Sequence, residues 1–316
     1  MSTGKEKSPR IAVLLHGNAG KADKYNCGST MPIEHSYNHL KKFLLNINEN
    51  VDVFMHSWST ELEEDLVNLY KPVDYKFEPQ ITFDFEYVVG DPDGPGGEIN
   101  RWVDGKFRGL DNLRFHSMFS RWYSARLVNE LKKKHEEENG FKYDFVMLTR
   151  YDLAYLIDFY FPTMDNNAVY LVGPDGWNED HEKGEIMQHG VHDLWMISNS
   201  KYIDHVCDNV FDMLRNINHF PGKFTHSHFF LRHFLKKTGL LEVVSFVGPP
   251  RPWNVGVKAK VMGPSPPVRE WYNLIETTPD SDMAKERKRI QEVSERLVRN
   301  TPDGGFEVVK INKDGQ

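Results

Sequence analysis

Two continuous apolar runs, each ending in a polar cluster, most constrain the fold of this chain. Residues Ile11 to Leu15 and Val51 to Met55 lack polar alternation, which is typical of strands buried on both faces of a parallel sheet. Between them a helical pattern begins near Ser36 and places Leu40 and Leu44 on one face. The order strand, helix, strand predicts a βαβ unit and an α/β fold.

The rest of the chain continues this alternation. Helical spacing of apolar residues predicts helices over residues 61–70 and 112–138, a helix marked by residues 202–213, and another over 226–237. Further strands are expected at 145–148, 168–173 and 193–198. Residues 72–110 lose periodicity and become rich in Gly and Pro, which predicts a surface excursion, either a lid or an inert loop. We expect a tail at 1–9, one catalytic domain at 10–275, and a C-terminal extension at 276–316 whose helix spans about 282–299.

Composition narrows the classes of partner. The 316 residues carry a net charge of −7, which argues against nucleic acid as the main partner because its phosphate backbone favours a basic surface. Two distant cysteines rule out a disulfide framework and favour a reducing compartment. The N-terminus has no apolar leader and no segment is long and apolar enough to span a membrane. We therefore expect a cytoplasmic protein without a signal peptide or transmembrane segment.

Polar residues gather where the predicted strands end. The clusters are His16-Gly17-Asn18, His56-Ser57-Trp58 and Arg150-Tyr151-Asp152, and a fourth cluster, "HGVHD" at 189–193, precedes a strand. Open α/β sheets bind ligands at the carboxyl ends of their strands. Several such clusters together predict a shared binding site at one edge of the sheet.

Each cluster has a functional and a structural interpretation. Asp152 beside Arg150 suits a pyrophosphate site, with the carboxylate on a hard divalent cation and the guanidinium on phosphate, or it is an ordinary ion pair at a strand end. Asp193 is either a general base or the first residue of a strand. The histidines His189, His192, His226 and His228 also suggest zinc, although cysteine ligands and an HExxH helix are lacking.

The order of these segments resembles a known family. The segments "IAVLLHGN", "VDVFMHSW", "HSMFSRWYSARLVNEL", "YDFVMLTRYDLAYL" and "HDLWMISNSKYID" are similar to those of cytoplasmic nucleotide-sugar glycosyltransferases of GT-A type from large DNA viruses and bacterial surface-polysaccharide loci. The similarity spans roughly residues 10 to 240. It implies a GT-A-like, Rossmann-like, mostly parallel central sheet flanked by helices, with the C-terminal helical extension added to it.

The resemblance also implies roles for particular residues. His16, Gly17, Asn18 and Arg150 would bind the nucleotide, and Asp152 would bind the diphosphate through Mn²⁺ or Mg²⁺. The family's usual Asp-x-Asp motif is replaced here by Arg150-Tyr151-Asp152, so one carboxylate is present instead of two and Arg150 would supply part of the metal's charge. Asp193 would be the base that deprotonates the acceptor hydroxyl in an inverting enzyme.

We therefore expect a glycosyltransferase that moves a sugar from a nucleotide-diphosphate sugar to a hydroxyl of a glycan acceptor. Weaker candidates for contact with the sugar or acceptor are His192, Trp195 and Trp177. Two alternatives stay open: a metal-dependent hydrolase built on the histidines, and a catalytically inactive carbohydrate-binding protein of the same fold. The terminal helix would pack either on the domain or on a second copy in a homodimer.

Overall fold

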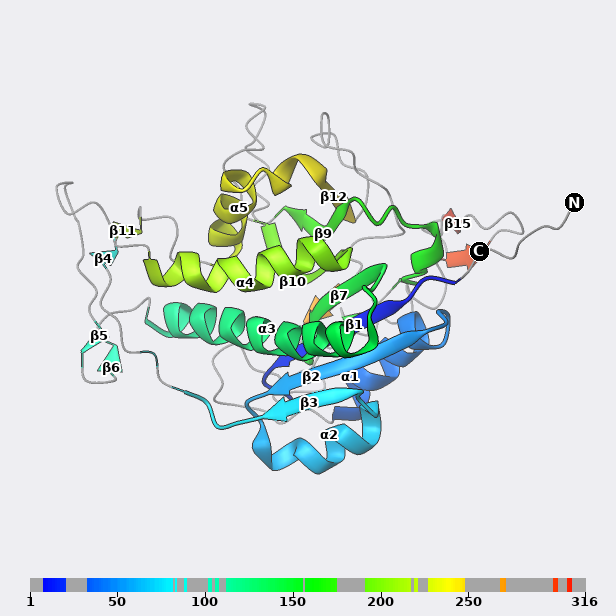
Figure 1. Cartoon of the computed structure of the whole chain (residues 1–316), viewed down its shortest axis with the longest axis horizontal. Helices are drawn as coiled ribbons and strands as arrows, with labels where there is room; N and C mark the ends of the chain where they lie inside the picture. The colour runs from blue at the N-terminus through cyan, green and yellow to red at the C-terminus, as the bar shows by residue number, and fades with distance from the viewer. Residues whose placement is uncertain are drawn as a thin grey trace, which may run out of the picture.

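The protein is described from a computed structural model that covers residues 8–20, 33–81, 83, 112–155, 157–174, 191–216 and 227–247, together with short strands at 88–89, 102–103, 106–107, 219–220, 268–270, 298–300 and 306–308. Its centre is a seven-stranded sheet (Figure 1). The strands of this sheet are β1 (Ile11–Gly17), β2 (Val51–Ser57), β3 (Asp74–Phe77), β7 (Phe145–Arg150), β9 (Val169–Pro174), β10 (Val191–Ser198) and β12 (Val244–Val247).

Strand order in the sheet is β12-β9-β10-β7-β1-β2-β3. Strand β10 runs antiparallel to both of its neighbours, whereas the other pairings are parallel. The mostly parallel α/β sheet expected from the sequence is therefore confirmed. Because β10 is reversed, its first residues lie at the same edge of the sheet as the carboxyl ends of the parallel strands.

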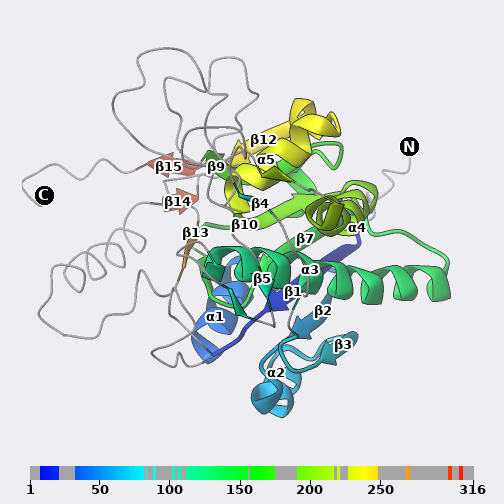
Figure 2. The same cartoon turned by 90° about the vertical axis from the view of Figure 1, so that its left-hand side faces the viewer.

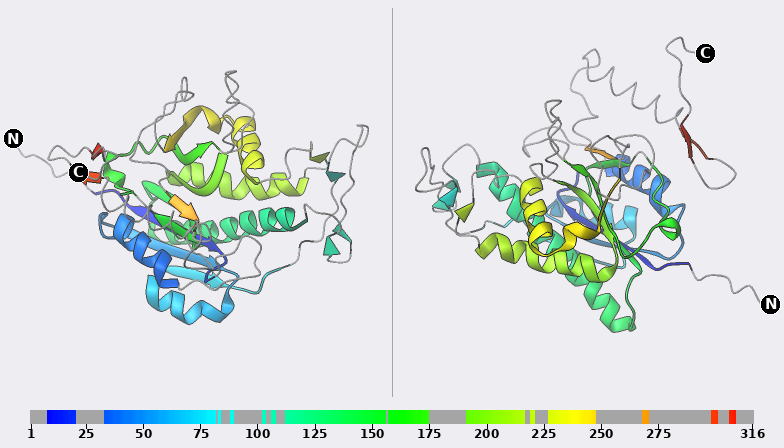
Figure 3. Two further views of the ribbon diagram at one scale, coloured as in Figure 1. Left: turned by 180° about the vertical axis from the view of Figure 1, so that it is seen from behind. Right: turned by 90° about the horizontal axis from the view of Figure 1, so that it is seen from above.

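Helices cover both faces of this sheet. They are α1 (Ile33–Leu40), which continues into a π-helical turn at Lys41–Leu45, α2 (Glu63–Tyr70), α3 (Asn112–Asn139), α4 (Ser200–Asn216) and α5 (Ser227–Lys237). The long helices α3 and α4 pack against one another on one face, and Figure 2 shows them crossing, with α4 seen nearly end-on. Helix α1 lies on the other face, as the left-hand view of Figure 3 shows. No described helix is long and apolar enough to cross a bilayer.

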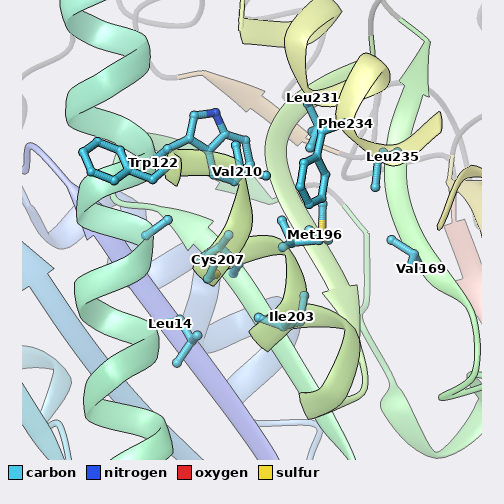
Figure 4. Packing of buried hydrophobic residues seen from close by; sticks show 14 of the residues in the cluster. Leu14, Trp122, Val169, Met196, Ile203, Cys207, Val210, Leu231, Phe234 and Leu235 are labelled. Carbon is cyan, nitrogen blue, oxygen red and sulfur yellow. The ribbon is translucent and has the colours of Figure 1, made fainter. Parts of the chain in front are cut away.

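Two hydrophobic clusters follow from the alternation of strand side chains. On β1, Ala12 and Leu14 pack toward α3 and α4, whereas Ile11 and Val13 pack toward α1. Figure 4 shows the first cluster, where side chains of α3, α4, α5 and the sheet meet; it includes Trp122, Met196, Val210 and Phe234. His16 follows the even-numbered residues of β1 and so belongs to the α3 side.

Several smaller elements were not anticipated. The sequence pattern does not predict the edge strand β3 or strand β12, since β3 is short and carries charged residues and β12 follows directly on a 3₁₀ turn at Leu240–Val243. Short pairs are formed by β4 (Val88–Val89) with β11 (His219–Phe220), β5 (Trp102–Val103) with β6 (Lys106–Phe107), β8 (Leu153–Tyr155) with β13 (Val268–Glu270), and β14 (Val298–Asn300) with β15 (Phe306–Val308). Two further 3₁₀ turns lie at Thr60–Leu62 and Phe161–Thr163.

Most of the expected terminal helix at about 282–299 lies outside the described residues. Its end is a correction to that prediction, because Val298–Asn300 forms a strand paired with β15. Apolar spacing alone does not distinguish a helix end from a short strand.

Candidate functional site

The polar clusters at the strand ends come together at one edge of the sheet. In the parallel register His16 pairs with His56 on β2 and with Arg150 on β7. Trp195 on β10 pairs with Thr149, so Asp193, two residues earlier on the reversed strand, lies near the end of β7. The sequence pattern predicts that these clusters share one edge of the sheet, and the strand topology places them at that edge.

The turn after β1 is held by backbone and side-chain hydrogen bonds. The Gly17 N–H donates to Ser124 Oγ of α3 at 2.9 Å, and the Gly17 carbonyl accepts from Ser57 Oγ at 2.9 Å and from the Trp58 N–H at 3.3 Å. Ser59 Oγ accepts from the Ala19 N–H at 3.0 Å. The expected nucleotide contact at Gly17 would therefore compete with internal partners for its backbone groups.

A buried histidine supports the same turn. His56 Nδ1 is 2.6 Å from Ser124 Oγ, and its Nε2 is 3.3 Å from Glu78 Oε1. Burial lowers the pKa of His56 to about 4 despite the opposing effect of Glu78, so the ring is neutral near pH 7. A neutral ring with hydrogen on Nε2 donates to Glu78 and accepts the Ser124 hydroxyl proton, which leaves Ser124 Oγ to accept from Gly17.

Asp193 is a buried carboxylate with three donors around it. It forms an ion pair with Arg121 Nη1 at 3.1 Å and accepts hydrogen bonds from His228 Nε2 at 2.9 Å and from the Ser227 hydroxyl. Burial alone would raise the pKa of Asp193, but Arg121 and His228 outweigh it and hold the pKa well below its usual value of 3.8. A general base works best with a pKa near the working pH. The geometry of Asp193 therefore suits orienting Arg121 and His228 better than accepting a proton.

Two of these partners carried no sequence signal. Arg121 lies inside the long amphipathic pattern of α3, one turn before Ser124, and Ser227 opens α5. Helical spacing marked α3 as a helix, but nothing in the spacing showed that Arg121 meets a carboxylate of β10. The sequence indicates His228 only as a candidate zinc ligand.

Arg150 and Asp152 form a forked ion pair. Arg150 Nε donates to Asp152 Oδ1 at 2.8 Å and Nη2 donates to Oδ2, with the side chains 23% and 16% exposed. The sequence allows two interpretations of these residues, and this geometry is that of an ordinary ion pair. Both carboxylate oxygens are thus engaged by the guanidinium, which keeps its plane fixed beside the end of β1.

His16 is the most unusual side chain at this edge. It is 1% exposed, and among the described residues neither ring nitrogen has a hydrogen-bond partner. Burial holds its pKa well below the usual value of 6.5, and Arg121, Arg150 and His56 lower it further against the opposing effect of Asp193. The ring is therefore neutral and lies among the charged groups described above.

The weaker sugar-contact candidates lie in different places. Trp195 is 1% exposed and packs edge-on against Phe159 in the cluster on the α1 side, with ring centroids 5.2 Å apart. Because the side chain is buried there, its ring offers no face for stacking on a sugar. His192 is half-buried with its ring centroid 4.9 Å from that of His228. Asn18 lies half-buried in the turn after β1, and Trp177 lies outside the described residues.

The carboxylates at this edge do not form a set of oxygen ligands for Mn²⁺ or Mg²⁺. Asp152 is engaged by Arg150, Asp193 by Arg121 and His228, and Glu78 by His56 and Lys76. Within the described part of the chain, no three His, Cys, Asp or Glu side chains gather as a metal site would require. The described residues thus do not fit a divalent cation unless Asp152 exchanges its arginine for the metal.

Comparison with known proteins adds no relative. No protein-family model matches the sequence, and no curated protein is significantly similar to it. Function is therefore inferred from the residue pattern, the topology of the sheet and the geometry of this edge.

Proposed function

We propose that the protein is a glycosyltransferase of GT-A type that uses a nucleotide-diphosphate sugar and a hydroxyl acceptor. The observation that carries the proposal is the meeting of His16, Arg150 and the Asp193–His228 pair at the carboxyl edge of a mostly parallel sheet. This is the edge at which open α/β sheets bind ligands. The seven-stranded sheet with one reversed strand is compatible with the fold implied by the sequence resemblance.

In the proposed reaction, the bond between the anomeric carbon and the diphosphate oxygen breaks as the acceptor oxygen bonds to that carbon. The electron pair leaves with the diphosphate, whose negative charge must be stabilised. Arg150, held in one plane by Asp152, is suited to bind phosphate oxygens. Because Asp152 balances the charge of Arg150, further positive charge is needed, and Lys223, Arg251 and Lys258 are candidates outside the described residues.

We assign removal of the acceptor proton to His228 and not to Asp193. Asp193 Oδ1 accepts a hydrogen bond from His228 Nε2, which makes Nδ1 the nitrogen that takes up a proton. The ionised Asp193 would then orient the ring and stabilise the imidazolium that forms. A single displacement by the acceptor gives inversion at the anomeric carbon.

The test of the donor site is thermal unfolding with each common nucleoside diphosphate, in Mn²⁺ and in EDTA. One nucleotide at 100 times its Kd should stabilise the folded state by about 2.7 kcal/mol. Arg150→Gln should weaken this effect, whereas Arg126→Gln, which alters an α3 arginine paired with Asp212, should not. If no nucleoside diphosphate stabilises the wild type in either condition, the proposal fails.

The test of catalysis is transfer from nucleotide sugars that carry the nucleotide identified in this way. His228→Gln should reduce the rate of transfer by about 10²- to 10⁴-fold while nucleotide binding remains. Nucleotide binding without turnover of any donor would favour the inactive carbohydrate-binding alternative. Stoichiometric zinc in the purified protein would favour the hydrolase, for which the contact between His192 and His228 is the supporting observation.

A further inference from the structure

His16 has a hydrogen-bonding capacity that the described part of the protein does not use. Its ring is buried, and Nδ1 and Nε2 both lack a partner there. Buried polar atoms in native proteins are nearly always hydrogen-bonded, so such an atom at the end of a central strand points to an absent partner. In His16 both ring nitrogens lack such a partner among the described residues.

Each arginine near His16 is paired with a carboxylate. Arg121 is paired with Asp193, and Arg150 is paired with Asp152, so the two guanidinium groups face two carboxylates. His56 is a further neighbour, neutral near pH 7, whose own partners are Ser124 and Glu78. An anion beside His16 would compete with these carboxylates for the two arginines, whereas a neutral polar group would leave both ion pairs in place.

The neutral ring also restricts the chemistry of its partner. Neutral imidazole has one N–H donor and one acceptor nitrogen. An unprotonated phosphate oxygen accepts hydrogen bonds only, so it would leave the acceptor nitrogen unsatisfied. A hydroxyl group both donates and accepts, so it can pair with either nitrogen of the neutral ring.

We propose that His16 anchors a subsite for the hydroxyl groups of a neutral sugar ring, flanked by the pairs Arg121–Asp193 and Arg150–Asp152. The inference rests on the proposed function and assigns His16 to the sugar of the donor in place of its nucleotide. The ring is closed off from bulk solvent, so a ligand reaches it when a neighbouring side chain rotates.

The experiment uses saturation-transfer NMR with the full chain and free monosaccharides as probes: glucose, galactose, mannose, N-acetylglucosamine, fucose, rhamnose and xylose. At least one sugar should bind the wild type and shift the imidazole nitrogen resonances assigned to His16. His16→Leu should weaken binding at least ten-fold, and His16→Gln, whose amide keeps a donor and an acceptor, should retain part of it. His16→Leu should also fold, because removing two unsatisfied buried atoms relieves a destabilising feature.

Three results would overturn the inference. The first is that no sugar in the panel binds the wild type. The second is that wild type and His16→Leu bind a sugar equally well. The third is that inorganic pyrophosphate shifts the His16 resonances and no sugar does. A nucleoside diphosphate without sugar should stabilise His16→Leu as it does the wild type. If that stabilisation is present while sugar binding is absent, the sugar subsite fails alone; if both are absent, the glycosyltransferase proposal fails with it.

Discussion

Asp193 Oδ2 lies 3.1 Å from Arg121 Nη1, joining the reversed strand β10 to helix α3 through side chains that are 3% and 12% exposed. Removing one member of a buried ion pair leaves an uncompensated charge and is strongly destabilising. We therefore expect Arg121→Met to lower the free energy of unfolding by about 3 kcal/mol, measured by urea denaturation. Arg126→Met, which breaks a more exposed pair with Asp212, should lower it by less than about 1 kcal/mol. Equal losses of unfolding free energy in the two variants would contradict the burial of the Arg121–Asp193 pair.

The free energy of unfolding should rise with pH between about 4 and 6.5 because of His56. The folded protein holds the pKa of His56 at about 4, below the value of 6.5 of an unperturbed ring, so the unfolded state binds more protons in this window. The contribution of His56 to the free energy of unfolding is on the order of 3 kcal/mol. It is fully present above pH 6.5 and is lost as the pH falls toward 4. Burial gives His16 a shift of the same sign.

The measurement is urea denaturation at pH 4.5 to 7.5 for the wild type and His56→Gln. The variant should be less stable at pH 7 and should show a flatter dependence on pH. The pH dependence of unfolding free energy that remains in His56→Gln should include the part due to His16. An unchanged slope would mean that His56 does not titrate as its surroundings predict.

Gly17 is required by the backbone of the turn and not by lack of space. Its φ is +100°, and an added Cβ would meet no atom within 4 Å. Gly17→Ala should therefore lower the free energy of unfolding by about 1–3 kcal/mol through backbone strain. Gly140, with φ +66° and equally open space, is the matched control, since Asn tolerates that left-handed conformation and Gly140→Asn should cost less than about 1 kcal/mol. Similar small losses at both positions would argue against a strained turn after β1.

Lys132 should matter for stability and not for ligand binding. Its fully buried ammonium group is 3.1 Å from Glu136 Oε2 and 2.8 Å from Asp204 Oδ1, at the α3–α4 contact. Lys132→Met leaves these carboxylates without that cation and should lower the free energy of unfolding by about 3 kcal/mol. The adjacent Lys133, paired with Asp208 and one-third exposed, provides the control, because Lys133→Met should cost less than about 1 kcal/mol.

Nucleotide and sugar affinities of folded Lys132→Met should equal those of the wild type. The Lys132 network includes Tyr143, whose N–H bonds to Glu136 just before β7 begins, so it lies at the end of the sheet opposite His16. Loss of binding in the folded variant would show that the two ends of the sheet are coupled.

The sequence determined the main elements because burial imposes a period on apolar residues. The run Ile11 to Leu15 predicted β1, and the spacing through Trp122 and Val128 predicted α3, both confirmed by the structure. It also placed polar clusters at the strand ends. Strand β3 escaped prediction because a short edge strand needs no apolar face.

Tertiary structure alone decided how the site is assembled and which roles its residues suit. The reversal of β10 brings Asp193 to the edge where β1 and β7 end, and strand direction leaves no mark in an apolar pattern. Once there, Asp193 meets Arg121 of α3 and His228 of α5, and these two groups hold its pKa below the usual value, which suits an orienting role better than that of a base. His16 was visible in the sequence as a polar residue at a strand end, but only the packing around it shows a neutral ring with both nitrogens unused.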